Sequence, residues 1–316
     1  MITQIYIKRG PVEPEHYDLL SKDQLLPLQQ HWLYGKALSS FGADIEQIIA
    51  YKGDKPIALT MITKRKLFGF IQFSVIFRGP LWLNPDISED DKVATLRCIM
   101  DDYKKWRWQF CTILPEQPES KQADSLMKRA GLRKSMTGFS TAWVDLRGSE
   151  AELHARLKGK WRNQLKKAEA ADFEIVVGSS KPDHYNWLFT REQEQRSDRR
   201  YQATPIGLVP SYVLMARANK LPPLVSITAH LRREKIAGAL FLIHGNSATY
   251  HIGWSGEAGR DMNAQNRVLW AGMLALREHG VLYLDLGGMN TAELANVTRF
   301  KLGIGADPIT LAGAYM

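Results

Sequence analysis

The chain has 316 residues, 45% of them hydrophobic and 24% charged, a globular composition with enough apolar material for one large domain or two of ordinary size. Its two cysteines, Cys98 and Cys111, lack the spacing of metal ligands, which argues against a disulfide framework or a structural zinc site and favours a reducing cytoplasm. The net charge of +9 is typical either of a basic cytoplasmic enzyme or of a protein with a phosphate-rich partner, such as nucleic acid, an anionic lipid head or a nucleotide.

The first ten residues alternate in hydropathy as a strand does, and they lack the basic and apolar regions of a signal peptide. The longest apolar stretches, such as 236–243, fall far short of the ~20 residues that span a bilayer. We therefore expect a soluble, cytoplasmic protein without a transmembrane segment.

Hydrophobic periodicity and turn residues predict the elements of the first half. Gly53-Asp54-Lys55 separates two apolar runs and indicates a hairpin. The pattern then predicts two short strands within 70–86, a helix over 91–108, a strand over 110–116, a helix over 120–131 and a strand over 139–146.

The second half repeats this order of elements. The pattern predicts three strands over 224–254, a helix over 263–279, a strand over 281–288, a short helix over 291–302 and a last strand over 307–316. The recurrence favours two α+β domains, 1–147 and 148–316, with the border near Arg147-Gly148. The alternative is one continuous domain whose elements happen to recur.

A basic helix is predicted over 149–171, at the start of the second domain. Ser149 and Glu152 have the spacing of a capping box. An apolar stripe recurs every four residues, at Leu153, Leu157, Trp161 and Leu165.

The charge on this predicted helix is one-sided. Residues 156–167 include six basic residues and no acidic one. Lys158, Arg162 and Lys166 share a face by their spacing, so we expect them to meet phosphate groups, although a solvated basic face remains the alternative. Arg199 and Arg200 are weaker candidates, because acidic residues are interleaved with the arginines around them.

Several familiar chemistries lack support in the sequence. It contains no phosphate-binding loop, no dinucleotide-binding glycine motif, no nucleophile elbow and no histidine set with metal-ligand spacing. A reaction that depends on positioning and charge stabilisation fits what remains.

Three stretches of the second half resemble motifs of the Fem-type aminoacyltransferases. They are "LKGKWRNQLKKAEAADFEIVVG", the run from "YHIGW" to "YLDLGG", and "TRFKLGIGAD". The resemblance implies an α+β fold of two tandem acetyltransferase-like (GNAT) domains, each a mixed, mostly antiparallel sheet flanked by helices. It also implies transfer of an amino acid from aminoacyl-tRNA to an amine, typically on a peptidoglycan precursor.

The resemblance places Lys301 at the family's catalytic cleft, since it occupies the lysine of the F-K-x-G run. Ile304 departs from the family, which has an aromatic residue there, and the long coiled-coil arm of some members has no counterpart.

The same fold suggests a mouth between splayed strands around residues 283–301. Asp285 would end a strand beside it, to orient or deprotonate the attacking amine or only to cap the next turn. Gly287 and Gly288 would let the backbone approach a ligand, or form a simple turn. Tyr250 and Trp254 would line the cleft or fill the core.

We therefore expect an enzyme that transfers an aminoacyl group from tRNA to a primary amine on a peptidoglycan precursor, peptide or metabolite. The partners would be tRNA and an acceptor that is lipid-linked or nucleotide-linked, with no metal and no cofactor. One alternative is an acyl-CoA-dependent N-acyltransferase, for which Gly256 and Gly259 offer a partial pyrophosphate motif. The other alternative is a basic binding module without catalysis.

Overall fold

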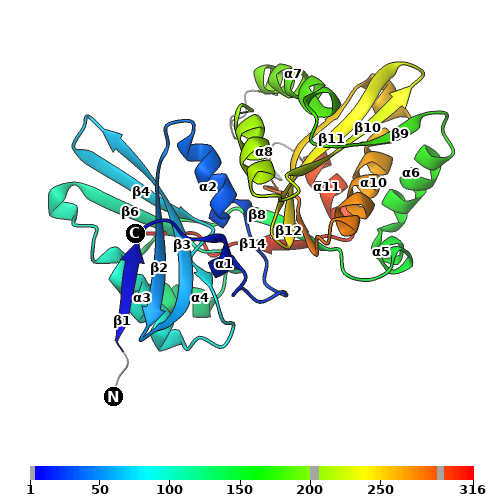
Figure 1. The fold of residues 1–316 in the computed structure, drawn as a ribbon. Helices are drawn as coiled ribbons and strands as arrows, with labels where there is room; N and C mark the ends of the chain where they lie inside the picture. The colour runs from blue at the N-terminus through cyan, green and yellow to red at the C-terminus, as the bar shows by residue number, and fades with distance from the viewer. Residues whose placement is uncertain (1–3, 200–205, 290–294) are drawn as a thin grey trace. The chain divides into compact units, whose positions relative to one another are not determined.

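Two β-sheets organise the chain in the computed structural model, which describes residues 4–199, 206–289 and 295–316 (Figure 1). Each sheet belongs to its own compact unit. Unit 1 comprises Met1–Ser140 and Ile309–Met316, and unit 2 comprises Thr141–Pro308. Both sheets are mixed, mostly antiparallel and flanked by helices, which confirms the predicted fold class.

In unit 1 the strands lie in the order β1-β2-β3-β4-β6-β15-β7, with β5 paired to β3. They span Ile5–Arg9 (β1), Asp44–Lys52 (β2), Lys55–Leu67 (β3), Ile71–Phe77 (β4), Leu81–Trp82 (β5), Gln109–Leu114 (β6), Lys134–Met136 (β7) and Ala314–Tyr315 (β15). The predicted hairpin forms, with Gly53 in its turn at a φ of +58°.

Two helices cover one face of this sheet, and α2 (Trp32–Ser39) packs on the other. The amphipathic helices α3 (Glu89–Met100) and α4 (Lys121–Arg129) bury Leu96 and Met127 against sheet residues such as Ile62. Shorter elements complete the unit: α1 (Pro14–Tyr17), η1 (Leu28–Gln30), α2 (Trp32–Ser39) and η2 (Lys105–Arg107).

In unit 2 the strand order is β14-β8-β13-β12-β11-β10-β9. The strands span Ser140–Asp145 (β8), Glu174–Gly178 (β9), Leu224–Leu231 (β10), Glu234–His244 (β11), Ser247–Ser255 (β12), Tyr283–Asp285 (β13) and Asp307–Thr310 (β14). The helices are α5 (Glu150–Arg156), α6 (Gly159–Glu169), α7 (Pro182–Arg199), α8 (Leu208–Ala218), α9 (Glu257–Asp261), α10 (Ala264–Glu278) and α11 (Ala295–Gly303).

The core of unit 2 lies between its sheet and three of these helices. Leu153, Trp161 and Leu165 from α5 and α6 are fully buried with Leu269 of α10 and Phe241 of β11. The predicted apolar stripe is thus confirmed as a core face.

The predicted basic helix is two helices, not one. The Ser149–Glu152 capping box forms as predicted and starts α5. Leu157 then adopts an extended conformation, with φ −60° and ψ 134°, and α6 restarts at Gly159. Periodicity misses the break because Leu153 before it, Leu157 at it and Trp161 after it are all buried.

The observed border differs from the predicted one near residues 147 and 148. Strand β8 ends the predicted first domain, but it pairs with β13 of unit 2, Asp145 opposite Tyr283. The chain's last residues return to unit 1, where Tyr315 of β15 pairs with Ile113 of β6. Strand pairing joins residues that are distant in sequence, so a border drawn from element order misses both exchanges.

Among the helices that the structure describes, none combines the length and hydropathy needed to cross a bilayer.

Because the carboxyl-terminal segment returns to unit 1, we predict that Gly138 does not tolerate a larger side chain. A Cβ at Gly138 would lie 1.7 Å from the backbone oxygen of Leu311, and the Leu311 backbone is held by the hydrogen bond from its N–H to the Phe139 oxygen at 3.1 Å. We expect Gly138→Ala to lower the free energy of unfolding by about 3 kcal/mol, measured by urea denaturation.

Gly159→Ala is the matched control, because a Cβ there meets nothing within 4 Å. Equal stability of the two variants would contradict the close packing of residues 138 and 311.

Candidate functional site

Strands β12 and β13 separate at one end of the unit 2 sheet. They are parallel, and their register pairs Ser247 with Tyr283 and Thr249 with Asp285. Strand β13 ends there, while β12 continues to Ser255 along its other neighbour, β11. One edge of β12 is thereby opened to a ligand.

A cavity of about 530 Å³ lies along this opened part of β12. Its register with β11 passes from Phe241–Tyr250 to Leu240–Ile252, which leaves His251 as a bulged residue. A bulge bends its strand and increases the local twist, so it helps to widen the gap. Polar side chains from several helices reach the walls, among them Gln164, Glu192, Gln195, Asn266 and Lys301.

Lys301 is a buried cation on the wall of this cavity. Its residue is 9% exposed, and its Nζ donates a hydrogen bond to the backbone oxygen of Gly288 at 3.0 Å. Burial lowers the pKa of Lys301 from 10.5 to about 8, while the negative charge of Asp285 opposes part of this shift. The predicted meeting of Lys301, Asp285 and the glycine pair is therefore present.

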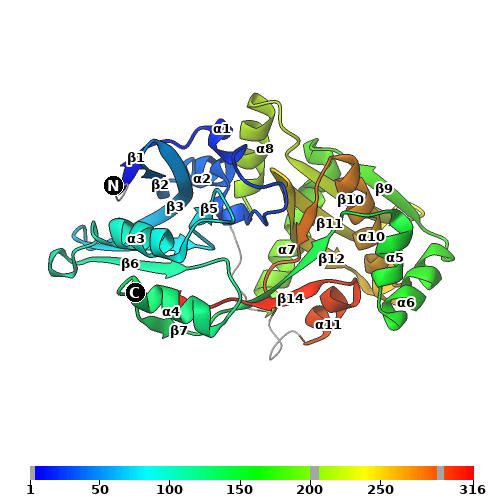
Figure 2. The same cartoon turned by 90° about the horizontal axis from the view of Figure 1, so that it is seen from below.

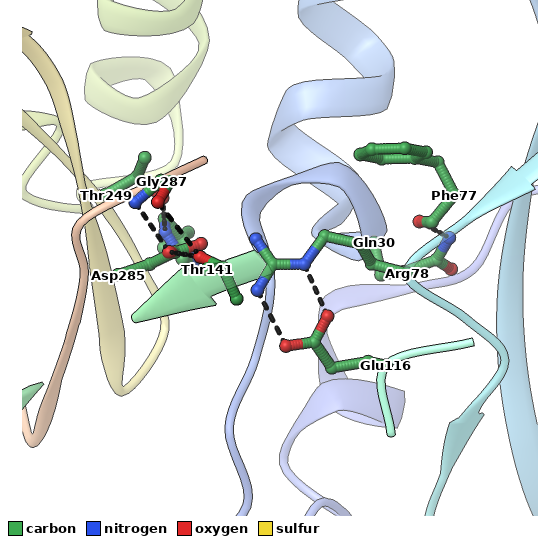
Figure 3. Close-up of polar contacts among 9 residues, drawn as sticks. Gln30, Phe77, Arg78, Glu116, Thr141, Thr249, Asp285 and Gly287 are labelled. Atoms are coloured by element: carbon green, nitrogen blue, oxygen red, sulfur yellow. Dashed lines mark hydrogen bonds and ion pairs between the residues drawn. The ribbon is translucent and has the colours of Figure 1, made fainter. Parts of the chain in front are cut away.

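The buried Asp285 side chain forms a hydrogen bond that holds the glycine turn in place (Figure 3). Its Oδ1 accepts hydrogen bonds from the backbone N–H of Gly287 at 2.8 Å and from the Thr141 hydroxyl at 2.9 Å. The side chain is buried, and it is not among the described residues that line the cavity. These contacts favour the capping role over direct deprotonation of an amine. Gly287 has a φ of +70°, which a glycine adopts without strain.

Some buried polar atoms on the cavity wall lack a hydrogen-bond partner among the described residues. They belong to Ser255 (Oγ), Gln265 (Oε1) and Asn266 (Nδ2). An unpaired buried polar group costs about 1–3 kcal/mol, so these atoms favour a polar ligand. The sequence analysis missed them, although Asn266 sits on the apolar stripe of α10, where an amide is unexpected.

Tyr250 and Trp254 both line the cavity, as one of the two predicted alternatives has it. Tyr250 also packs on Phe241, and its hydroxyl accepts a hydrogen bond from Gln265 Nε2 at 2.9 Å. Desolvation raises the pKa of Tyr250 to about 12, so its hydroxyl stays protonated at neutral pH. Trp254 makes an edge contact with Trp187.

Helix α6 lies beside the helix that carries Lys301. Trp161 packs on Phe300 with ring centroids 6.0 Å apart, and the N–H of Lys158 donates to the Gly303 oxygen at 2.9 Å. The basic segment is therefore fixed next to the cavity.

Two of the three predicted residues lie on the flank of α6 away from the cavity, and the third, Lys158, is the residue that precedes the helix. Gln164 lines the cavity, and Lys160 and Lys167 share its face at helical spacing. Arg162 and Lys166 fall on the opposite flank by the same spacing. Arg162 also donates from Nη2 to the Leu157 oxygen at 2.8 Å, which caps the end of α5.

The structure does not describe the side chains of the other two predicted arginines. Arg199 ends α7, but its side chain is not among the described ones, and Arg200 lies outside the described residues.

In unit 1 the corresponding parallel pair stays closed. Strands β4 and β6 pair from Gln72–Gln109 to Phe77–Leu114. Arg78 directly follows β4 and is 2% exposed. Its side chain pairs with Glu116 through Nε and Nη2 (Figure 3). The smaller cavity of unit 1, about 320 Å³, borders Glu116 and has mostly apolar walls.

Within the described ranges no group of three or more His, Cys, Asp or Glu is placed to hold a metal ion.

The duplicated sheet and the strand gap define a tandem acetyltransferase-like (GNAT) fold. The chain is similar to the solved structure of FemX, with a TM-score of 0.77 and 14% identity over 98% of this chain and 96% of that one. This finding confirms the predicted resemblance to a Fem-type protein at the level of the fold. No protein-family model and no curated protein sequence matches the chain.

Two further solved structures share the fold. A tandem GNAT protein from the clavulanic acid biosynthesis pathway has a TM-score of 0.56 and 11% identity over 99% of this chain and 98% of that one. The C-terminal domain of a predicted lysylphosphatidylglycerol synthetase from Agrobacterium fabrum has a TM-score of 0.54 and 15% identity, over 91% and 88%.

The burial of Lys301 predicts a pH-dependent stability difference. Because its pKa is lower in the folded protein than in the unfolded chain, the unfolded chain binds more protons between pH 8 and pH 10.5. The wild type therefore gains stability as the pH rises through that range, and Lys301→Met does not. We expect Lys301→Met to be the more stable protein at pH 7, and its advantage to shrink by about 3 kcal/mol by pH 10.

Urea unfolding at a series of pH values measures this difference, with the exposed Lys181→Met as the control. An advantage that stays constant with pH would contradict a buried lysine that titrates near pH 8.

Proposed function

We propose that the protein is an acyltransferase that moves an aminoacyl group from aminoacyl-tRNA to a primary amine. The observation that carries the proposal is the buried Lys301 ammonium on the wall of a polar cavity where two parallel strands part. The amine attacks the ester carbonyl, a tetrahedral oxyanion forms and collapses, and the ribose hydroxyl leaves as the amide is made. The ester is already activated, so the protein has to align the amine and stabilise the oxyanion.

Lys301 supplies the charge for that oxyanion. Its pKa of about 8 leaves it mostly protonated at neutral pH, in a site where burial strengthens electrostatic interactions. The carbonyl of Gly288 fixes the ammonium, and Asp285 in turn fixes the glycine turn. Asp285 thus acts as a positioning residue.

Other side chains of the cavity hold the substrates. Tyr250 offers a neutral hydroxyl, and Gln265 and Asn266 offer amide groups that can pair with the polar parts of an aminoacyl ester. In this proposal Lys160 and Lys167, on the cavity flank of α6, bind phosphates of the tRNA acceptor end.

An acyl-CoA donor is the second candidate, because the tandem GNAT protein from the clavulanic acid pathway has the same fold. The partial glycine motif gives it little support. A Cβ at Gly259 would lie 2.2 Å from the Ile236 oxygen, and one at Gly256 would lie 2.9 Å from the Trp254 ring. Packing within unit 2 therefore accounts for both glycines. A basic binding module without catalysis is the third candidate.

The kinetic prediction concerns Lys301. We expect Lys301→Ala to reduce kcat for amide formation by about 10²–10³, the usual effect of removing an oxyanion-stabilising group. The assay offers radiolabelled aminoacyl-tRNA or acetyl-CoA to the protein with a panel of amines. The exposed Lys181→Ala is the control, and circular dichroism checks the fold.

Transfer of label from acetyl-CoA alone would favour the second candidate, and transfer from neither donor would favour the binding module. Lys301→Arg adds a pH test. Arginine stays charged, so a loss of activity above pH 8 in the wild type should move to higher pH in this variant.

The donor prediction compares the two flanks of α6. We expect the double variant Lys160→Glu/Lys167→Glu to weaken tRNA binding by about tenfold or more, and to reduce the slope of log K against log salt by about 1 for each lost phosphate contact. Filter binding at several salt concentrations measures both quantities. The matched control is Lys158→Glu/Lys166→Glu, which reverses two charges of the same segment, at the residue before α6 and on its far flank. An equal effect of the two pairs would contradict the assignment of the cavity flank.

A further inference from the structure

One end of the unit 1 sheet gathers exposed aromatic side chains. The Phe68-Gly69-Phe70 turn joins β3 to β4, and the segment 104–108 leads into β6 (Figure 2). The two segments are adjacent, because the N–H of Gln72 donates to the Trp108 oxygen at 2.8 Å. Phe70 and Trp108 also make an edge contact, with centroids 6.5 Å apart.

The apolar side chains here are strongly exposed. We define the aromatic end as Leu67, Phe68, Phe70, Phe73, Trp106 and Trp108. Their exposed fractions are 42%, 79%, 62%, 45%, 73% and 55%, in that order. Exposed apolar side chains gathered at one end of a folded unit mark an interaction site.

The two segments that form the aromatic end carry positive charge, part of which Glu46 neutralises at Lys64. Residues 63–73 and 104–110 include six basic residues and no acidic one. Arg65, Lys66, Lys104 and Arg107 are exposed, and the Arg107 guanidinium lies 4.5 Å from the centroid of the Trp106 ring. An anionic partner is therefore complementary to this surface.

We propose that the aromatic end binds the surface of an anionic lipid bilayer. The turn inserts Leu67, Phe68 and Phe70 between the head groups, where apolar side chains leave water. Trp106 and Trp108 lie at head-group level, where amphipathic rings are favoured. The basic side chains reach back to lipid phosphates, as long charged side chains do at interfaces.

The residue types favour a bilayer over single-stranded RNA. Leu67, Phe68 and Phe70 lie at a tight turn, where Phe68 has a φ of +51° and Gly69 of +80°, so an aliphatic leucine is part of the exposed surface. A base-stacking platform needs open ring faces along a groove. Here Phe73 stacks on Phe110, with centroids 5.6 Å apart.

This surface does not depend on the reaction proposed above, because none of its residues lines the unit 2 cavity. Membrane binding would place the enzyme where lipid-linked amines are found.

The test is co-sedimentation of the full chain with vesicles of phosphatidylcholine alone or mixed with phosphatidylglycerol. We expect binding to the mixed vesicles only, and weaker binding as salt is added. The variant Phe68→Asn/Phe70→Ser should lower the apparent partition constant by about tenfold or more. Asparagine suits the left-handed backbone at residue 68, so the variant should fold. The control Leu214→Ser removes an equally exposed apolar side chain of α8.

A second pair of variants tests the charge. Arg65→Glu should weaken binding to the mixed vesicles several-fold, and Lys121→Glu, on the exposed start of α4, should not. Equal binding to neutral and anionic vesicles, or equal loss in Leu214→Ser, would overturn the proposal.

The other occupants have their own readouts. If the aromatic variants bind vesicles normally and lose only tRNA affinity, the surface is an RNA site. If they change only the oligomeric mass by light scattering, it is a contact between copies of the chain. Either result would overturn membrane docking. Transfer to a soluble acceptor without vesicles should stay unchanged in all of these variants, which separates this proposal from the proposed reaction.

Discussion

The site depends on the hydrogen bond that holds the buried Lys301 ammonium to the Gly288 carbonyl. A lysine that is 9% exposed has lost most of its hydration, and its charged form survives through the Gly288 carbonyl and the nearby Asp285 carboxylate. This arrangement costs stability at neutral pH. A loss of stability of this kind is typical of a functional site, where a charged group is positioned to bind a ligand and does not stabilise the fold.

The two units show that the same kind of parallel strand pair can either separate at its end or stay paired. Both have a parallel strand pair in an otherwise antiparallel setting. In unit 2 the pairing ends at Thr249, and a bulge at His251 widens the gap. In unit 1 it continues to Phe77, and the Arg78–Glu116 pair closes its end. A change of a few residues at a strand end thus decides whether a sheet offers a cavity, as expected when ligand sites are added to a common fold.

Much of the local structure could be predicted because its causes are local. The Ser149 capping box, the Gly53 turn and the apolar stripe through Trp161 all formed as expected. Other features escaped prediction because their causes lie far away in the chain. The break at Leu157 leaves both adjoining helices packed in one core, so the stripe passes through it without a signal.

The features of the candidate site also divide into those with local causes in the sequence and those that depend on distant contacts. The sequence alone determined the residue types: a late lysine, a strand-end acid, two glycines and a basic segment. Only the tertiary structure decided that Asp285 binds the glycine turn, that Lys160 and Lys167 share the cavity flank of α6, and that Asn266 reaches the cavity wall. It also decided that the last strand, Ala314–Tyr315, joins the first sheet and not the second. The physical reason is that spacing along a chain fixes which side chains share a face, whereas strand pairing and helix packing decide what that face meets.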